Sequence, residues 1–153
     1  MKRLLLILFL AISTILFGQN RYHIDETTLS LDGYGFVYLK KDSVLVTGII
    51  YSVYKKGKIK MEHNYKKGVL SGLFINWHKN GQLKYKAIYS NNEPVGIEKS
   101  WHKNGQLQSE GNYPFYREWH KNGQLKLEMN SGAELKGNSK NCWDKKGNEI
   151  ECK

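Results

Sequence analysis

The chain has 153 residues, of which 40% are hydrophobic, 12% aromatic and 25% charged. This composition is too apolar and too aromatic for a disordered chain, and the length allows one domain or an elongated stack of repeats. The formal net charge of +10 predicts attraction to an anionic partner, such as nucleic acid, lipid head groups or an anionic envelope polymer.

The first residues have the pattern of an export signal. Lys2 and Arg3 precede a predominantly apolar run over residues 4–17, which Gly18 ends. The run is shorter than the roughly 20 residues that a helix needs to span a bilayer, so residues 1–18 are predicted to be a cleaved signal peptide. The remaining chain stays basic, because the segment carries two cations and no acid. We expect the protein to be periplasmic or extracellular, where nucleic acid is not an expected partner.

A segment with strand-like runs lies between the signal and the rest of the chain. Asp32-Gly33 is a turn signal, and the runs Phe36–Leu39 and Val44–Thr47 are rich in residues that favour strands. Residues 19–47 are therefore predicted to form an amino-terminal cap of strands.

The remaining chain is a repeat. The heptad WHKNGQL occurs at 77–83, 101–107 and 119–125, and weaker copies flank it as VYKKGKI at 53–59 and WDKKGNE at 143–149. The heptad glycines are 24, 24, 18 and 24 residues apart, and the short step lacks a polar connector like the SNNEPVG at 90–96. These spacings divide residues 48–153 into five units. The units are 48–71, 72–95, 96–113, 114–136 and 137–153.

Each full unit contains two runs of alternating polarity, bounded by Gly, Asn or Pro. That pattern predicts two strands and two turns per unit. In the unit 72–95 it predicts one apolar face, with Phe74 and Ile88 as exceptions. The predicted face consists of Leu73, Ile75, Trp77, Leu83, Tyr85, Ala87 and Tyr89. The predicted fold class is therefore all-β: an elongated or curled antiparallel meander of about five stacked hairpins with an amino-terminal β cap.

The apolar pattern also selects the turn between the two strands. A two-residue Asn80-Gly81 turn would place Trp77 opposite Lys84 and would scatter the apolar residues over both faces. A three-residue loop that begins at Lys79 and has a left-handed glycine avoids this. It pairs Trp77 with Leu83, Ile75 with Tyr85 and Leu73 with Ala87. The equivalent glycines, predicted to have positive φ, are Gly57, Gly81, Gly105, Gly123 and Gly147.

The heptad followed by strand residues, with a glycine opening the next unit, resembles the MORN-repeat variant family over roughly residues 45–150. Many bacterial proteins of this kind are labelled YwqK-type antitoxins, and MORN repeats elsewhere are scaffolds that bind proteins or anionic lipids. The resemblance thus implies a binding role. An exported chain could neutralise only a partner that it meets outside the cytoplasm.

Besides Lys55 in the first turn, the four later turns carry a lysine at the same position, which stacking would align along one edge. This edge could bind lipid phosphates or wall polymers. It could also serve solubility and protection against further strand pairing, and the recurrence of the lysines with the turn favours this second interpretation. The lysines are Lys79, Lys103, Lys121 and Lys145.

The heptad histidines and tryptophans have architectural explanations. His78, His102 and His120 would lie about 9 to 10 Å apart on consecutive hairpins, whereas a metal ion needs donors at about 2 Å. We therefore expect solvated loop positions and no metal site. The tryptophans stand opposite leucine in three copies, which predicts a core ladder and not a sugar-binding surface. They are Trp77, Trp101, Trp119 and Trp143.

Cys142 and Cys152 both lie in the last unit. A loop over residues 145–147 pairs Cys142 with Ile150 and makes Cys152 a diagonal neighbour, about 7 to 8 Å away and at the limit for a disulfide. A loop shifted by one residue would place the cysteines directly opposite. One balanced pair in an exported chain favours a disulfide that closes the terminal hairpin.

The sequence offers no nucleophile with its base, paired carboxylates, phosphate-binding glycine loop or metal-ligand spacing, so we expect neither catalysis nor a cofactor. The leading expectation is an exported protein-interaction module, whose partner could be a toxin-like protein. The alternatives are adhesion to an anionic membrane or envelope polymer through the lysine edge, and a purely structural envelope protein.

Overall fold

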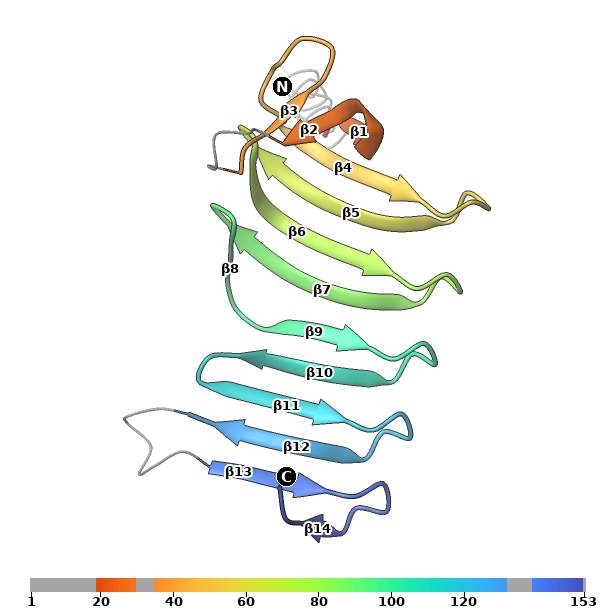
Figure 1. The fold of residues 1–153 in the computed structure, drawn as a ribbon, viewed down its shortest axis with the longest axis vertical. Coiled ribbons are helices and arrows are strands. Elements are labelled where there is room, and N and C mark those ends of the chain that lie inside the picture. The colour runs from red at the N-terminus through yellow and green to blue at the C-terminus, as the bar shows by residue number, and fades with distance from the viewer. Residues whose placement is uncertain (1–18, 30–34, 132–138, 153) are drawn as a thin grey trace, which may run out of the picture.

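The computed structural model describes residues 19–29, 35–131 and 139–152. The predicted signal peptide and the Asp32-Gly33 turn lie outside these residues. One large sheet dominates the described chain, as the all-β prediction requires, and the regular elements beside it are a short 3-10 turn and a two-stranded sheet (Figure 1).

The large sheet has twelve strands in the order β1-β4-β5-β6-β7-β9-β10-β11-β12-β13-β14, with β8 paired to β7. All its neighbours are antiparallel except β1 and β4. The strands are β1 (Arg21–His23), β4 (Gly48–Val53), β5 (Ile59–Lys66), β6 (Val69–Trp77), β7 (Leu83–Ser90), β8 (Glu93–Pro94), β9 (Glu98–Trp101), β10 (Leu107–Asn112), β11 (Phe115–Trp119), β12 (Leu125–Asn130), β13 (Ser139–Trp143) and β14 (Glu149–Ile150).

Five hairpins make up most of this sheet, and their turns stack along one edge (Figure 1). In the second hairpin the His78 amide donates to the Gln82 carbonyl at 2.8 Å, and the Gly81 amide donates to the His78 carbonyl at 2.9 Å. This is the predicted three-residue loop, and Gly81 has φ of +93°. The other four turn glycines have φ between +77° and +88°, a region that disfavours residues with a Cβ atom.

A β-bulge next to each of the first four turns overturns part of the predicted register. Trp77 pairs with Leu83 as predicted, but Asn76 pairs with Tyr85 because Lys84 is an extra residue on β7. Ile75 therefore faces Lys86 and not Tyr85, and Leu73 faces Ile88 and not Ala87. The predicted apolar face is thus divided between the two sides of the sheet.

We name the two sides after their contents. The tryptophan face carries the heptad tryptophans with their partner leucines, and also Leu73, Ile75 and Ile88. The cavity face carries Phe74, Tyr85, Ala87, Ser100, Ser109, Glu118, Leu127 and Cys142.

The amino-terminal segment packs against the cavity face at the first hairpin. It contributes β1, the 3-10 turn η1 (Ile24–Glu26) and the small sheet of β2 (Thr27–Leu29) and β3 (Val37–Leu39). The predicted strand at 44–47 is only an isolated bridge between Leu45 and Tyr38. The most deeply buried cluster lies here, and Tyr22, Met61 and Tyr65 pack against it. Its members are Val37, Leu39, Val46 and Ile50.

The 18-residue step is accommodated at the edge opposite the stacked turns. There a tight Tyr113-Pro114 turn with a cis peptide joins β10 to β11. The equivalent connection from β7 to β9 spans residues 91–97 and includes β8. The shorter connection leaves the stacking of the heptad turns unchanged, because the third and fourth turns make the same hydrogen bonds to each other as the turns that are 24 residues apart.

Candidate functional site

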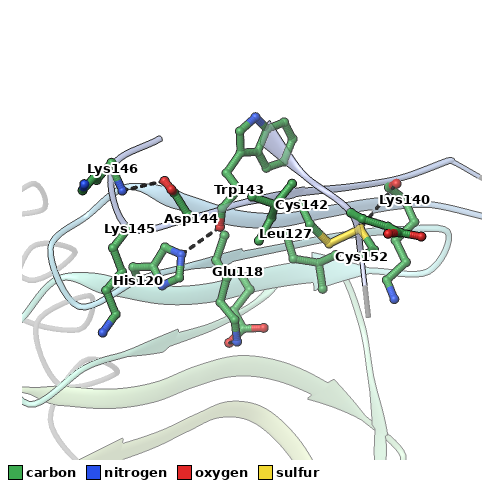
Figure 2. Close-up of a pocket in the computed structure, with 13 residues that line it drawn as sticks. Glu118, His120, Leu127, Lys140, Cys142, Trp143, Asp144, Lys145, Lys146 and Cys152 are labelled. Atoms are coloured by element: carbon green, nitrogen blue, oxygen red, sulfur yellow. Dashed lines mark hydrogen bonds and ion pairs between the residues drawn. A yellow bond between two sulfur atoms is a disulfide. The ribbon is translucent and has the colours of Figure 1, made fainter. Parts of the chain in front are cut away.

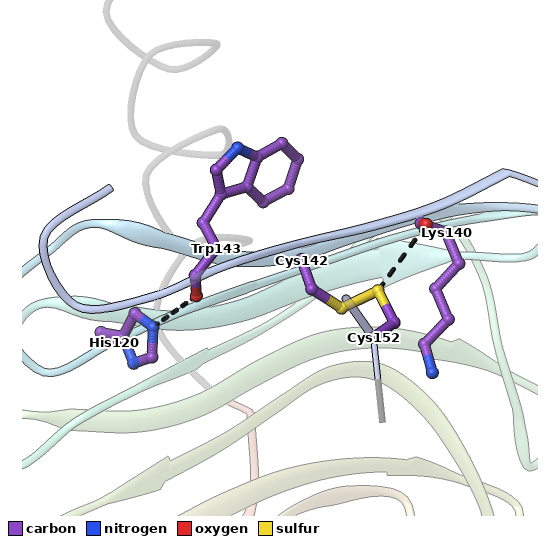
Figure 3. The surroundings of a disulfide bond; sticks show 5 residues. All are labelled: His120, Lys140, Cys142, Trp143 and Cys152. Carbon is purple, nitrogen blue, oxygen red and sulfur yellow. Dashed lines mark hydrogen bonds between the residues drawn. A yellow bond between two sulfur atoms is a disulfide. The ribbon is translucent and has the colours of Figure 1, made fainter. Parts of the chain in front are cut away.

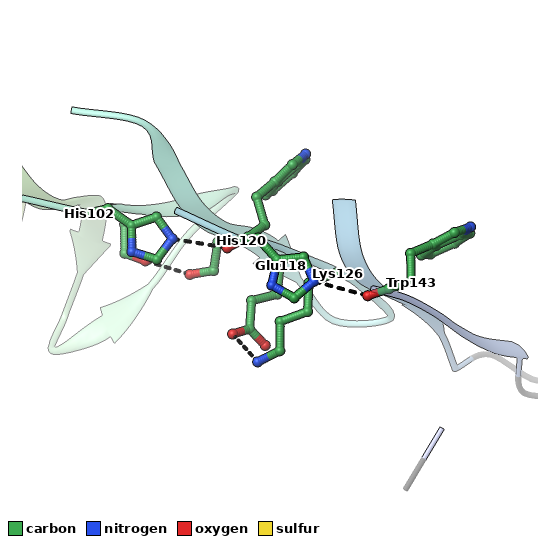
Figure 4. Close-up of polar contacts among 8 residues, drawn as sticks. His102, Glu118, His120, Lys126 and Trp143 are labelled. Atoms are coloured by element: carbon green, nitrogen blue, oxygen red, sulfur yellow. Dashed lines mark hydrogen bonds and ion pairs between the residues drawn. The ribbon is translucent and has the colours of Figure 1, made fainter. Parts of the chain in front are cut away.

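Histidine side chains join consecutive turns. The Nε2 atom of His78 lies 2.8 Å from the Trp101 carbonyl oxygen, and the corresponding distances from His102 to Trp119 and from His120 to Trp143 are both 2.9 Å (Figure 4). The three rings are half-buried. The prediction of solvated loop histidines is therefore wrong: each ring binds the backbone of the next repeat, and we call this series the histidine ladder.

Asparagine and glutamine form parallel series. The Asn80 side chain donates to the Lys103 carbonyl at 2.7 Å, and its Oδ1 accepts from the Gln82 amide at 3.2 Å. Asn104 and Asn122 make the same pair of bonds in their repeats. A Cβ atom on the next turn's glycine would meet a glutamine side chain: Gln82 at Gly105, Gln106 at Gly123 and Gln124 at Gly147. The heptad residues His, Asn, Gly and Gln are thus explained by contact between repeats.

The first and last turns depart from this pattern. Tyr54 takes the histidine position, and its hydroxyl donates to the Trp77 carbonyl at 2.7 Å. Lys56 and Lys58 replace the asparagine and the glutamine. In the last turn Asp144 accepts from the Lys146 amide at 2.7 Å, and hydrogen bonds to Asn148 and to backbone amides lower the pKa of this carboxyl. Asp144 therefore binds within its own turn, whereas the histidines at the same position in the three preceding turns bind the next repeat.

The structure places the predicted lysine edge along these turns. Lys79, Lys103, Lys121 and Lys145 are exposed, and the backbone carbonyls of the last three accept the asparagine bonds. The asparagines therefore hold the lysine backbones at regular intervals, while the ammonium groups remain in solvent.

The described side chains of the tryptophan face are half-buried or exposed, and the apolar content of this face changes along the sheet. The heptad tryptophans and their partner leucines are half-buried, so they form a cross-strand ladder on an open face and not a closed core. Beyond the second hairpin, Lys99 and Arg117 occupy the position of Ile75. They pair across strands with Glu110 at 3.1 Å and with Glu128 at 2.6 Å.

Aliphatic side chains are exposed on the second hairpin. Leu73 is 40% exposed and its cross-strand partner Ile88 is 51% exposed. Val95, 43% exposed, donates its amide to the Ile88 carbonyl. We call these three residues the aliphatic patch. Contiguous exposed apolar residues of this kind are typical of surfaces that bind another molecule.

The cavity face carries an aromatic cluster that the sequence analysis did not predict. His63 is buried and stacks on Phe74 with ring centroids 3.5 Å apart. Burial lowers the pKa of His63, although its hydrogen bond to Asn76 opposes that shift. Burial, together with a hydrogen bond to Glu98, raises the pKa of Tyr85. These groups therefore stay neutral near pH 7 and fit a structural role.

The last hairpin closes the sheet with a disulfide. Cys142 pairs with Ile150, yet the chain leaves β14 so that Cys152 returns to within 5.4 Å of Cys142 between Cα atoms, and their sulfur atoms are bonded (Figure 3). The first of the two alternative loops, residues 145–147, is the one present. A cavity lies beside the disulfide on the cavity face, whereas Trp143 points to the other side of the sheet (Figure 2). Four lysines line this cavity, and three acidic residues line it as well. The acidic residues are Glu118, Asp144 and Glu151.

Within residues 19–29, 35–131 and 139–152, no group of three His, Cys, Asp or Glu side chains is arranged to hold a metal ion. The same residues include no helix with the length and hydrophobicity that crossing a bilayer requires.

Of the residues singled out from the sequence, the structure brings together the turn lysines, the turn glycines and the two cysteines. The aliphatic patch and the Phe74–Tyr85 contact of the aromatic cluster were missed, because both depend on the bulge at Lys84. Their signal in the sequence was that Phe74 and Ile88 break the predicted alternation.

Comparison with known proteins agrees with the repeat geometry. A family model described as the MORN repeat variant matches residues 70–91 and 94–113, which contain the second and third hairpins. No curated protein matches the chain. The two matched segments, 70–91 and 94–113, are therefore similar in sequence to the MORN repeat variant.

Proposed function

We propose that this protein is an exported, non-catalytic protein-interaction module whose partner docks on the aliphatic patch. The observation that carries the proposal is the exposure of Leu73, Ile88 and Val95 side by side on the second hairpin. Covering such side chains stabilises a complex by about 25 cal/mol for each Å² of apolar surface removed from water. The export-like first residues and the disulfide support a location outside the cytoplasm.

The local charges favour a protein partner over a lipid layer at this patch. On the same face, the Lys99–Glu110 pair lies on β9 and β10, next to β7, and the Arg117–Glu128 pair lies further along the sheet on β11 and β12. An apolar centre with mixed charges around it is the usual arrangement of protein interfaces. We propose further that the partner is a toxin-like protein, which this chain neutralises by binding it outside the cytoplasm.

The test compares one face with the other. Ile88→Lys introduces a charge into the aliphatic patch, and Gln108→Lys introduces the same charge at an exposed bulge position beside the cavity face. Immobilised wild-type protein should retain one stoichiometric partner from envelope extract, Ile88→Lys should lose it, and Gln108→Lys should keep it. Equal retention by both variants would contradict the proposal, and so would the absence of a partner, which a purely structural envelope protein would give.

The lysine edge supports a second candidate, adhesion to an anionic membrane or envelope polymer. Its specific observation is that the asparagine bonds hold the backbones of Lys103, Lys121 and Lys145 in register. Binding to anionic vesicles or wall material should then decrease as salt is raised, and should decrease when Lys79, Lys103 and Lys121 are changed to Glu.

A further inference from the structure

The junction between the first and second turns differs from every later junction of the heptad turns. At the later junctions an asparagine and a glutamine of one turn reach the next turn. At the first junction Lys56 and Lys58 occupy these positions, and a Cβ atom added at Gly81 would meet nothing within 4 Å. Only the Tyr54 hydroxyl, bonded to the Trp77 carbonyl, takes the place of a ladder contact here.

The space left by the missing contacts is an open cavity of about 750 Å³. Its walls are Val53, Tyr54 and lysine side chains. The lysines are Lys55, Lys56, Lys58, Lys60 and Lys79. Lys60 reaches the cavity because it is the extra residue of the first bulge, between Ile59 and Met61. The two departures of the first turn, Lys56 and Lys58, thus add two cations beside the bulge lysine Lys60. The second and fourth repeats also have a bulge lysine, but their turns have Asn and Gln at these positions.

These cations have no acidic counterpart in the part of the chain that the structure describes. There, no carboxylate lines the cavity, and none of its lysines forms an ion pair. The cavity beside the last turn is different, because Glu118 and Asp144 accompany its lysines. A concave surface with charges of a single sign concentrates the electrostatic potential and attracts a counter-ion.

We propose that this cavity is a binding site for a polyvalent phosphate group, and we call it the first-junction site. Several ammonium groups around one cavity match a ligand with several negative oxygens close together, because each ammonium can donate a charge-assisted hydrogen bond. Tyr54 also lines the site, and the hydrogen bond from its hydroxyl to the Trp77 carbonyl holds its side chain in place. The proposal does not depend on a protein partner at the aliphatic patch, which lies on other strands.

The repeat itself supplies the test variant. Changing Lys56→Asn together with Lys58→Gln converts the first turn to the K-N-G-Q of the three identical heptads, so the altered turn is one that this chain already folds. The matched control, Lys66→Gln with Lys84→Gln, removes the same charge from exposed lysines that lie outside both the cavity and the lysine edge. The probes are sodium tripolyphosphate, followed by titration calorimetry, and vesicles of phosphatidylcholine with or without phosphatidylglycerol.

The wild-type chain should bind tripolyphosphate at one site, with an affinity about ten-fold or more above that of the Lys56→Asn/Lys58→Gln variant. The control variant should stay within about two-fold of the wild type, because its lysines lie outside the cavity. If phosphatidylglycerol vesicles show the same pattern, the natural phosphate is a lipid head group. If only tripolyphosphate does, it is a free phosphate compound.

Equal losses in the two variants would overturn the first-junction site, because they would show attraction to the overall charge. The absence of saturable binding by the wild type would also overturn it, as would binding of a polyglutamate peptide in place of tripolyphosphate. These results leave the aliphatic patch untouched, so failure of this site is distinguishable from failure of the protein-binding proposal.

Discussion

Replacing His102 by Phe should destabilise the sheet, and replacing it by Tyr should not. His102 is half-buried, and its Nε2 lies 2.9 Å from the Trp119 carbonyl. A hydrogen bond of this kind contributes about 0.5 to 1.5 kcal/mol net, and a carbonyl that loses its partner while partly buried adds to the loss. Phe keeps the ring and removes the donor, so we expect a loss of about 1 to 2 kcal/mol.

Tyr is the matched rescue, because Tyr54 makes the equivalent bond to the Trp77 carbonyl in the first repeat. His102→Tyr should therefore remain within about 0.5 kcal/mol of the wild type. Guanidinium unfolding followed by tryptophan fluorescence measures both variants, and hydrogen exchange of the β9–β12 amides shows whether the change is local, as expected for stacked repeats. The explanation of the histidine ladder is refuted if Phe is as stable as His, or if Tyr destabilises as much as Phe.

Three further predictions address stability. Burial lowers the pKa of His63 in the folded protein, so the unfolded chain binds more protons as pH falls below about 6.5, and the free energy of unfolding should decrease there. His63→Gln should weaken this pH dependence of the guanidinium midpoint, and an unchanged pH dependence would contradict the prediction. Gly57→Ala should cost about 1 kcal/mol through its positive φ. Gly123→Ala should cost slightly more, because its Cβ would lie 2.5 Å from Oε1 of Gln106 and would displace the flexible end of that side chain; equal losses would argue against that contact. Replacing Cys142 and Cys152 by Ser should cost about 2 to 3 kcal/mol for their separation of 10 residues, with faster exchange confined to β13 and β14; unchanged exchange would exclude this role of the disulfide.

The repeat period, the hairpins and the turn were predictable because they depend on local chemistry. A three-residue loop with a left-handed glycine is determined by residues within a few positions of Gly81, and the apolar pattern next to the turn fixes the Trp77–Leu83 pair. The stacking of units follows from the repetition itself. The trimmed 18-residue step was also readable, because shortening one connection leaves the heptads intact.

The division of residues between the two faces was not predictable from alternation alone. The extra residue Lys84 moves every later side chain of β7 to the opposite face of the sheet. The alternation of polar and apolar residues does not show where such an extra residue lies. Phe74 and Ile88 are exceptions to the predicted alternation. With the bulge, Phe74 lies opposite Ala87 on the cavity face, and Ile88 lies opposite Leu73 on the tryptophan face.

The histidine ladder was unpredictable for a different reason. The distance between consecutive hairpins argues against a shared metal ion, but it does not show whether a ring can reach the carbonyl of the neighbouring turn. That contact depends on the three-dimensional stagger of the turns, which places the Trp101 carbonyl 2.8 Å from His78. The first-junction site likewise depends on the absence of the asparagine and glutamine contacts from the first turn, and the sequence alone does not show that these residues contact the next turn.

Site-specific photo-crosslinking tests most directly whether the protein binds a partner through its aliphatic patch. A photoreactive phenylalanine analogue placed at Ile88 probes the patch, and the same analogue at Gln108 probes the bulge position beside the cavity face. The account predicts one discrete adduct with an envelope protein from position 88 and none from position 108. An adduct from position 108 alone, or none from either position, would contradict it.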